Sequence, residues 1–121
     1  MKSQRLRSAL HDMASQPDVL GCALVGTEDG MLWHAEGAMT SLDVLASSSS
    51  DYWRLNRRTQ ESFDGLGELR MLALFHQSGQ ILVSECGTRM LLVLVTSRMK
   101  GIDWERWKSE HAKLAALVND M

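Results

Sequence analysis

The sequence predicts an α+β fold in which an antiparallel five-stranded sheet lies between helices, with the element order α-β-β-α-β-β-β-α. Two nearly continuous apolar runs, residues 19–25 and 90–95, are typical of strands that are covered on both faces. Turn signals such as Asp29-Gly30 and Ser78-Gly79 separate neighbouring strand patterns by only a few residues. Connections this short join strands as hairpins, so the sheet is expected to be antiparallel.

Taken in order, the apolar spacing predicts a helix over residues 3–16 that is stopped by Pro17, and strands over 19–25 and 31–36. A long helix should begin at Thr40 or Ser41, where Thr40 and Asp43 have the spacing of a capping box. It should end before Gly65, which makes it about 23 residues and about 35 Å long. Strands over 69–76, 81–86 and 90–95 and a helix over 102–118 complete the chain.

The strand order follows from which strands are apolar throughout. Only central strands of a sheet covered by helices bury both faces, so the first and fifth strands should lie side by side in the centre. This predicts the order 2-1-5-4-3, with the second and third strands at the edges. The long helix should cover one face and the two terminal helices the other.

Composition narrows the classes of protein. The 121 residues suffice for one domain, which we expect to span residues 1–121. A formal charge of -2 argues against nucleic-acid binding, which calls for a basic surface. Without an apolar leader or a long apolar run, we expect a cytoplasmic protein with no membrane insertion. Cys22 and Cys86 are interpreted as buried free thiols in a reducing compartment.

Motifs for catalysis, metals and cofactors are weak in this sequence. Residues 21–26 have the glycine spacing of a phosphate loop, but Thr27-Glu28 stands where that loop needs Lys-Ser/Thr. No two of the four histidines have the spacing of metal ligands, and His111 is interpreted as a core histidine bonded to a carbonyl. We therefore expect no catalytic residue, no cofactor and no metal, and an enzyme is the class that the sequence supports least.

The long helix carries the most information about function. A helical period of 100° per residue divides it into three stripes. The stripe assigned to the sheet contains Leu42, Leu45, Ala46, Ser49, Trp53, Asn56, Gln60 and Phe63. A separate small or apolar stripe, here called the outer stripe, contains Val44, Ser48, Tyr52, Leu55 and Thr59. The sheet cannot reach the outer stripe, so the sequence predicts a homodimer interface that combines it with Leu69, Met71 and Ala73 of the third strand.

The third stripe contains a basic cluster formed by Arg54, Arg57 and Arg58. It suggests a docking surface for an acidic partner, or an arginine offered to a nucleotide-hydrolysing protein. The favoured interpretation is a solvated helix face, in which Asp51 and Glu61 balance the arginines through i,i+3 and i,i+4 pairs.

Three segments together resemble the roadblock/LC7 family of dynein light-chain and GTPase-regulator domains. They are Val-Leu-Gly-Cys-Ala-Leu-Val-Gly-Thr-Glu-Asp-Gly at 19–30, the helix start Thr-Ser-Leu-Asp-Val-Leu-Ala-Ser at 40–47, and Met-Leu-Leu-Val-Leu-Val at 90–95. The resemblance covers nearly the whole chain and lies in the order and spacing of these segments. It implies a profilin-like fold, a homodimer with one sheet across two chains, and non-enzymatic regulation or scaffolding of a small Ras-like GTPase.

Two alternatives from other classes stay open. A profilin-like or PAS-like sensory module would bind a small molecule between sheet and helices, and the polar candidates there are His34, Ser84 and Glu85. A secretion chaperone would need a broad apolar groove and a more acidic chain. A Ras-like GTPase gene next door would favour the regulator, and a histidine-kinase or transporter gene the sensor.

Overall fold

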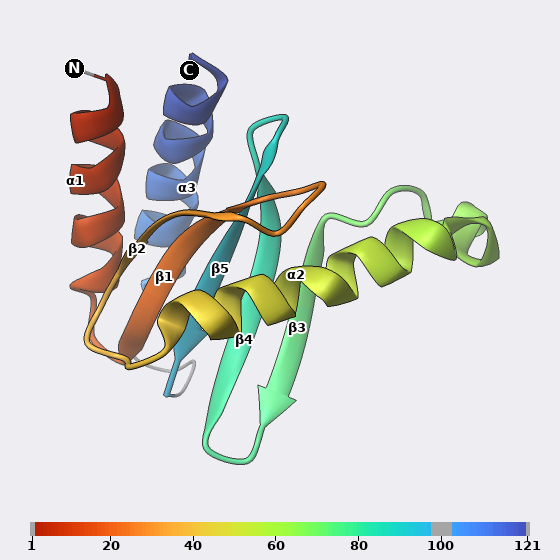
Figure 1. Cartoon of the computed structure of the whole chain (residues 1–121), viewed down its shortest axis with the longest axis horizontal. Helices are drawn as coiled ribbons and strands as arrows, with labels where there is room; N and C mark the ends of the chain where they lie inside the picture. Colours follow the sequence, from red (N-terminus) through yellow and green to blue (C-terminus); the bar gives the residue numbers. More distant parts are fainter. Residues whose placement is uncertain (1, 98–102, 121) are drawn as a thin grey trace.

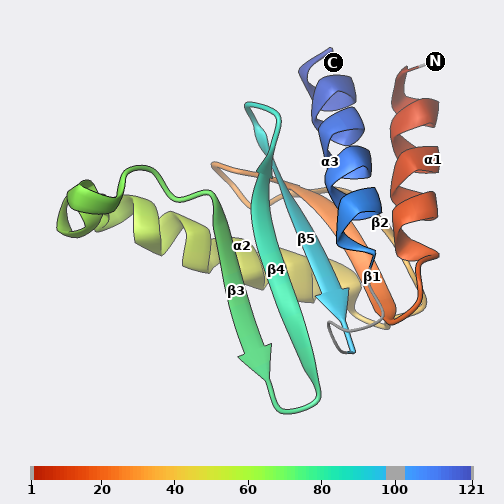
Figure 2. The same ribbon diagram turned by 180° about the vertical axis from the view of Figure 1, so that it is seen from behind.

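The computed structural model describes residues 2–97 and 103–120, and its elements follow the predicted order. The sheet is antiparallel with the order β2-β1-β5-β4-β3, which confirms the prediction. Helix α2 crosses one face of the sheet, and α1 and α3 lie side by side on the other (Figures 1 and 2). The elements are α1 (Lys2–Ala14), β1 (Val19–Gly26), β2 (Leu32–Glu36), α2 (Leu42–Arg58), the 3-10 helix η1 (Gln60–Leu66), β3 (Met71–His76), β4 (Gly79–Cys86), β5 (Met90–Thr96) and α3 (Trp104–Asn119).

The two central strands separate two apolar layers. Successive side chains of a strand point to opposite faces, so Cys22 and Leu24 of β1 face α1 and α3 while Ala23 and Val25 face α2. The side chains of β5 alternate between the two layers in the same way, and its residues 91–96 are all buried. The solid apolar runs therefore mark central strands, as predicted.

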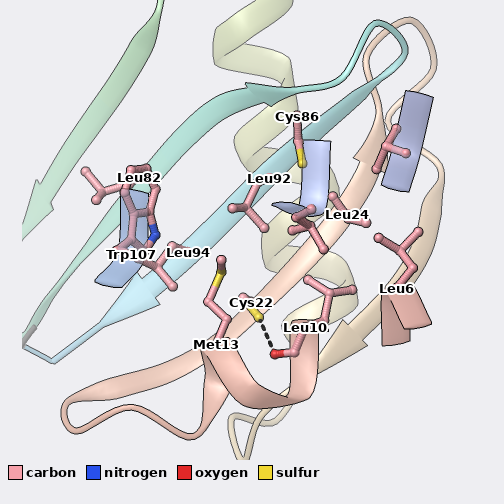
Figure 3. Packing of buried hydrophobic residues seen from close by; sticks show 12 residues of the cluster. Leu6, Leu10, Met13, Cys22, Leu24, Leu82, Cys86, Leu92, Leu94 and Trp107 are labelled. Atoms are coloured by element: carbon pink, nitrogen blue, oxygen red, sulfur yellow. Dashed lines mark hydrogen bonds between the residues drawn. The ribbon is translucent and has the colours of Figure 1, made fainter. Parts of the chain in front are cut away.

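Both cysteines are unpaired and buried in the layer beneath α1 and α3 (Figure 3). The Cys22 thiol donates to the carbonyl oxygen of Leu10, with 3.3 Å between sulfur and oxygen. Burial raises the pKa of each thiol to about 12. The prediction of buried free thiols is confirmed.

The long helix is shorter than predicted, because α2 ends at Arg58 and η1 replaces its last turns. The Thr59 hydroxyl donates to the carbonyl oxygens of Leu55 and Asn56 at 3.1 and 3.3 Å, a local bond that competes with continued helix. None of residues 60–66 is buried, so no packing supports a further helical turn. The assignment of Gln60 and Phe63 to the sheet-facing stripe is therefore wrong, since both are exposed.

The helix starts also differ in detail from the prediction. Ser41 is the N-cap of α2 and has a left-handed backbone with no side-chain cap bond, so the Thr40–Asp43 capping box is wrong. Helix α3 begins at Trp104, and the Asp103 carboxylate caps it by accepting from the Arg106 backbone N–H at 3.1 Å. The predicted start of this helix, Ile102, lies outside the described residues.

Candidate self-association surface

The outer stripe of α2 lies in solvent. Val44, Tyr52 and Leu55 are 63%, 53% and 47% exposed, and Ser48 and Thr59 are also exposed. The opposite side of the helix packs on the sheet through the buried residues Leu42, Ala46, Ser49, Ser50 and Trp53. The outer stripe is therefore an exposed apolar strip of the kind that soluble proteins usually cover.

Strand β3 forms one edge of the sheet and pairs with β4 among the described residues. Its Met71 and Ala73 lie opposite Ser84 and Leu82, which face α3, yet both are exposed. Leu69 differs from them, because it precedes β3 and packs against the apolar layer beneath α2. The three residues predicted for the interface at this strand therefore do not share one face of the sheet: Met71 and Ala73 lie on one face and Leu69 on the other. The C-terminal half of α2 passes over β3 (Figures 1 and 2), so only the later part of the outer stripe, with Leu55 and Thr59, lies near this edge, whereas Val44 lies in the first turn of α2.

Two of the three arginines of the basic cluster have partners. Arg54 forms an ion pair with Asp51 and donates to the Thr27 carbonyl at 3.4 Å, while Arg57 lies 3.4 Å from the Glu28 carboxylate. The predicted Asp51–Arg54 pair is confirmed. The Arg58 side chain is exposed and makes no hydrogen bond or ion pair within residues 2–97 and 103–120, so it is the cluster's most available charge.

Three of the four histidines, His11, His34 and His111, take part in ion pairs or packing, and His76 is exposed. Glu36 accepts from His11 at 3.0 Å and from His34 at 2.6 Å, which lowers the pKa of Glu36 and ties α1 to β2. The His111 ring lies 3.2 Å from the Ser84 hydroxyl, and burial lowers its pKa against a weaker opposing effect of a hydrogen bond to the Glu85 backbone. Among the described residues, no group of three or more potential ligands could hold a metal ion.

A cavity of about 350 Å³ lies beneath the C-terminal half of α2, and the sequence analysis missed it. The predicted helix length of about 35 Å exceeds the roughly 19 Å width of a five-stranded sheet. This difference could have indicated that the end of the helix extends beyond the sheet. Asn56 and Gln60, assigned to the sheet, instead line the cavity. Its full lining is Thr27, Glu28, Trp53, Asn56, Arg57, Gln60, Phe63, Asp64, Gly67, Glu68, Leu69, Glu85 and Thr88.

No protein-family model matches the sequence, and no curated protein matches it. Several solved structures, in contrast, are similar to this chain over most of its length. A roadblock/LC7 domain from Streptomyces avermitilis is 24% identical with a TM-score of 0.74, over 96% of this chain and 93% of that one. MglB from Myxococcus xanthus is 15% identical with a TM-score of 0.80, over 97% of both chains. An MglB structure with a tetrameric arrangement is 20% identical with a TM-score of 0.79, over 98% of this chain and 91% of that one.

The element order and the strand order define a profilin-like sheet with one helix on one face and two on the other. The similar structures match almost the whole chain and identify the fold more specifically: this protein has the roadblock/LC7 fold. The resemblance predicted from the sequence is confirmed at the level of the fold. In the part of the chain that the structure describes, no helix has the length and apolarity needed to cross a membrane.

Proposed function

We propose that this chain is a non-enzymatic homodimer that regulates or scaffolds a small Ras-like GTPase in the cytoplasm, with residues 1–121 acting as one roadblock/LC7-like domain. The observations that carry the proposal are the exposed outer stripe and the nearby outer edge of β3, which has no strand partner among the described residues. A two-fold partner covers both at once, with α2 on α2 and β3 on β3, and gives a ten-stranded sheet. A similar chain, MglB, occurs in a tetrameric arrangement. The two free thiols support a reducing compartment.

The apolar area available on the outer stripe is large enough to matter. Fully burying a large apolar side chain contributes about 1.5–3 kcal/mol, so burying the exposed half of Leu55 or Tyr52 contributes about 0.8–1.5 kcal/mol per side chain before association costs are subtracted. Two-fold symmetry makes each contribution count twice. Placing a charge at Leu55 therefore removes at least about 1.5–3 kcal/mol, which weakens dimerisation by roughly 10–10²-fold or more.

Sedimentation of the wild type and of Leu55→Asp tests the interface. The wild type should be a dimer at tens of micromolar, and Leu55→Asp a monomer or, if the monomer is unstable, unfolded. Met31→Asp is the matched control, because Met31 is 69% exposed near the β1–β2 turn, away from the outer stripe. It should remain dimeric. A monomeric wild type would remove the proposed interface and the main support for the GTPase.

The GTPase itself is tested through the basic cluster. Each small Ras-like GTPase encoded in the same genome is mixed with the chain, and binding and nucleotide hydrolysis are measured. Arg58→Glu should weaken the complex, because Arg58 is the cluster's most available charge, while Arg106→Glu on α3 is the control. If no such GTPase binds the wild-type dimer, the regulator proposal fails.

The sensory-module alternative has less support. Two of its three polar candidates are occupied, since His34 bonds to Glu36 and Ser84 lies against His111. The layers between sheet and helices are filled by buried apolar side chains. Glu85 faces solvent and lines the cavity beneath the end of α2.

A further inference from the structure

The 3-10 helix η1 forms an arm that extends past the edge of the sheet. In Figures 1 and 2, residues 60–66 continue from the end of α2 to a position beyond β3. All seven residues of this arm are exposed. A Cβ added at Gly65 or Gly67 would meet no atom within 4 Å. The arm's own chain therefore gives it little to pack against.

The arm nevertheless carries two large apolar side chains. Phe63 is 44% exposed and Leu66 is 85% exposed. Phe63 also lines the cavity beneath α2, so Leu66 is the freer of the two. One exposed leucine is ordinary in a soluble protein. It gains meaning here because Val44, at the other end of α2, is 63% exposed and leaves a second apolar surface uncovered.

The two-fold arrangement proposed above brings these two surfaces together. Leu55 lies in the C-terminal half of α2, which passes over the β3 edge. With the two-fold axis beside Leu55, a residue that follows it faces the partner's residue that precedes it by the same number of positions. Leu66 comes eleven positions after Leu55, and Val44 eleven positions before it. Val44 is then about 16 Å from the axis, and Leu66 about 20 Å.

We infer that the arm of each chain packs on the first turns of the partner's α2, with Leu66 covering the partner's Val44 and Phe63 lying over the partner's Ser47 and Ser48. This inference rests on the proposed homodimer and identifies a second copy of the chain as the arm's binding partner. The small serine side chains allow the arm to approach α2 closely. A helix end that overhangs its own sheet would thus lie over the sheet of its partner.

The exposed apolar area supports this arrangement. A large side chain presents about 200 Å² when it is fully exposed, so the exposed parts of Val44, Tyr52 and Leu55 amount to about 300 Å² per chain. Two such stripes bury only about 600 Å², which is typical of crystal contacts. Adding Phe63 and Leu66 raises the total for two chains to about 1,100 Å², above the roughly 1,000 Å² that a specific interface needs.

Disulfide cross-linking of the full chain tests the register. Val44→Cys/Leu66→Cys should form a covalent dimer when it is treated with oxidised glutathione. Its two cysteines are about 36 Å apart within one chain, too far for an internal disulfide. Val44→Cys alone and Leu66→Cys alone should link about tenfold less, because identical positions lie at opposite ends of the interface. The native cysteines do not interfere, since both are 0% exposed.

Met31→Cys/Leu66→Cys is the matched control for random collisions, because Met31 is 69% exposed but lies near the β1–β2 turn. It should link no more than the single variants. Sedimentation gives a second measurement: Leu66→Asp should weaken dimerisation by about tenfold or more. Its own fold should be unchanged, because Leu66 is 85% exposed, and Met31→Asp should dimerise like the wild type.

The outcomes separate this inference from the proposed homodimer. If the wild type is a dimer but Val44→Cys/Leu66→Cys links no more than Met31→Cys/Leu66→Cys, the arm contact is overturned and the dimer stands. A Leu66→Asp variant that dimerises as tightly as the wild type has the same meaning. A monomeric wild type overturns the homodimer and the arm contact together.

Discussion

Native Cys22 and Cys86 should react with a thiol reagent about a thousand times more slowly than the same thiols in the unfolded chain. The attacking species is the thiolate, and burial raises both pKa values from 9.0 to about 12. At about pH 8 the thiolate fraction falls from about 10% to about 0.01%. Steric exclusion adds to this factor, because both side chains are 0% exposed.

The two thiols are measured separately in Cys86→Ala and Cys22→Ala, each of which leaves one cysteine. Labelling with an aromatic disulfide is followed by absorbance in buffer and in concentrated guanidinium chloride. Both variants should label slowly in buffer, at a rate that rises with pH, and quickly once unfolded. Labelling of native Cys22 within tenfold of its unfolded rate would refute the placement of β1 in the centre of the sheet.

Two further predictions concern stability. Gly37→Ala should lower the free energy of unfolding by more than about 3 kcal/mol, because Gly37 has φ 131° and an added Cβ would lie 2.5 Å from Gly21 Cα. Gly67→Ala is the control, because Gly67 has φ 81° but open space around it. In the same urea titration it should cost only about 1–2 kcal/mol. The free energy of unfolding should also fall in acid, because folding lowers the pKa of His111 and of Glu36 and unfolding therefore takes up protons. The loss from His111 should begin below about pH 6.5, and the loss from Glu36 below about pH 4.5. Urea midpoints across this range measure the loss, His111→Gln should abolish its upper part, and a midpoint that does not change with pH would contradict the prediction.

Much of the fold was predictable because its signals are local. The apolar runs of β1 and β5 identify central strands wherever helices cover both faces of a sheet. Within α2, the spacing of Leu42, Ala46 and Trp53 identified the buried side correctly. The outer stripe followed from the same period, and its exposure is confirmed for Val44, Tyr52 and Leu55. That a second chain covers it is still a prediction.

The site was less predictable, because it depends on where elements end relative to one another. The periodicity that places Trp53 on the sheet extends through Gln60 and Phe63, yet the helix ends at Arg58. Likewise, Leu69 follows the alternation of Met71 and Ala73 in the sequence but packs on the other face, because β3 begins only at Met71.

Local sequence patterns were enough to predict the order of the elements, the strand order and the buried side of α2 as far as Trp53. Each of these depends on periodicity and turn chemistry within a few residues. Long-range packing, in contrast, is what brings Arg54 to the Thr27 carbonyl and places Thr27, Trp53 and Glu68 around one cavity. These contacts join residues from distant parts of the chain, and their distances are set by how far α2 overhangs the sheet, which no local pattern encodes.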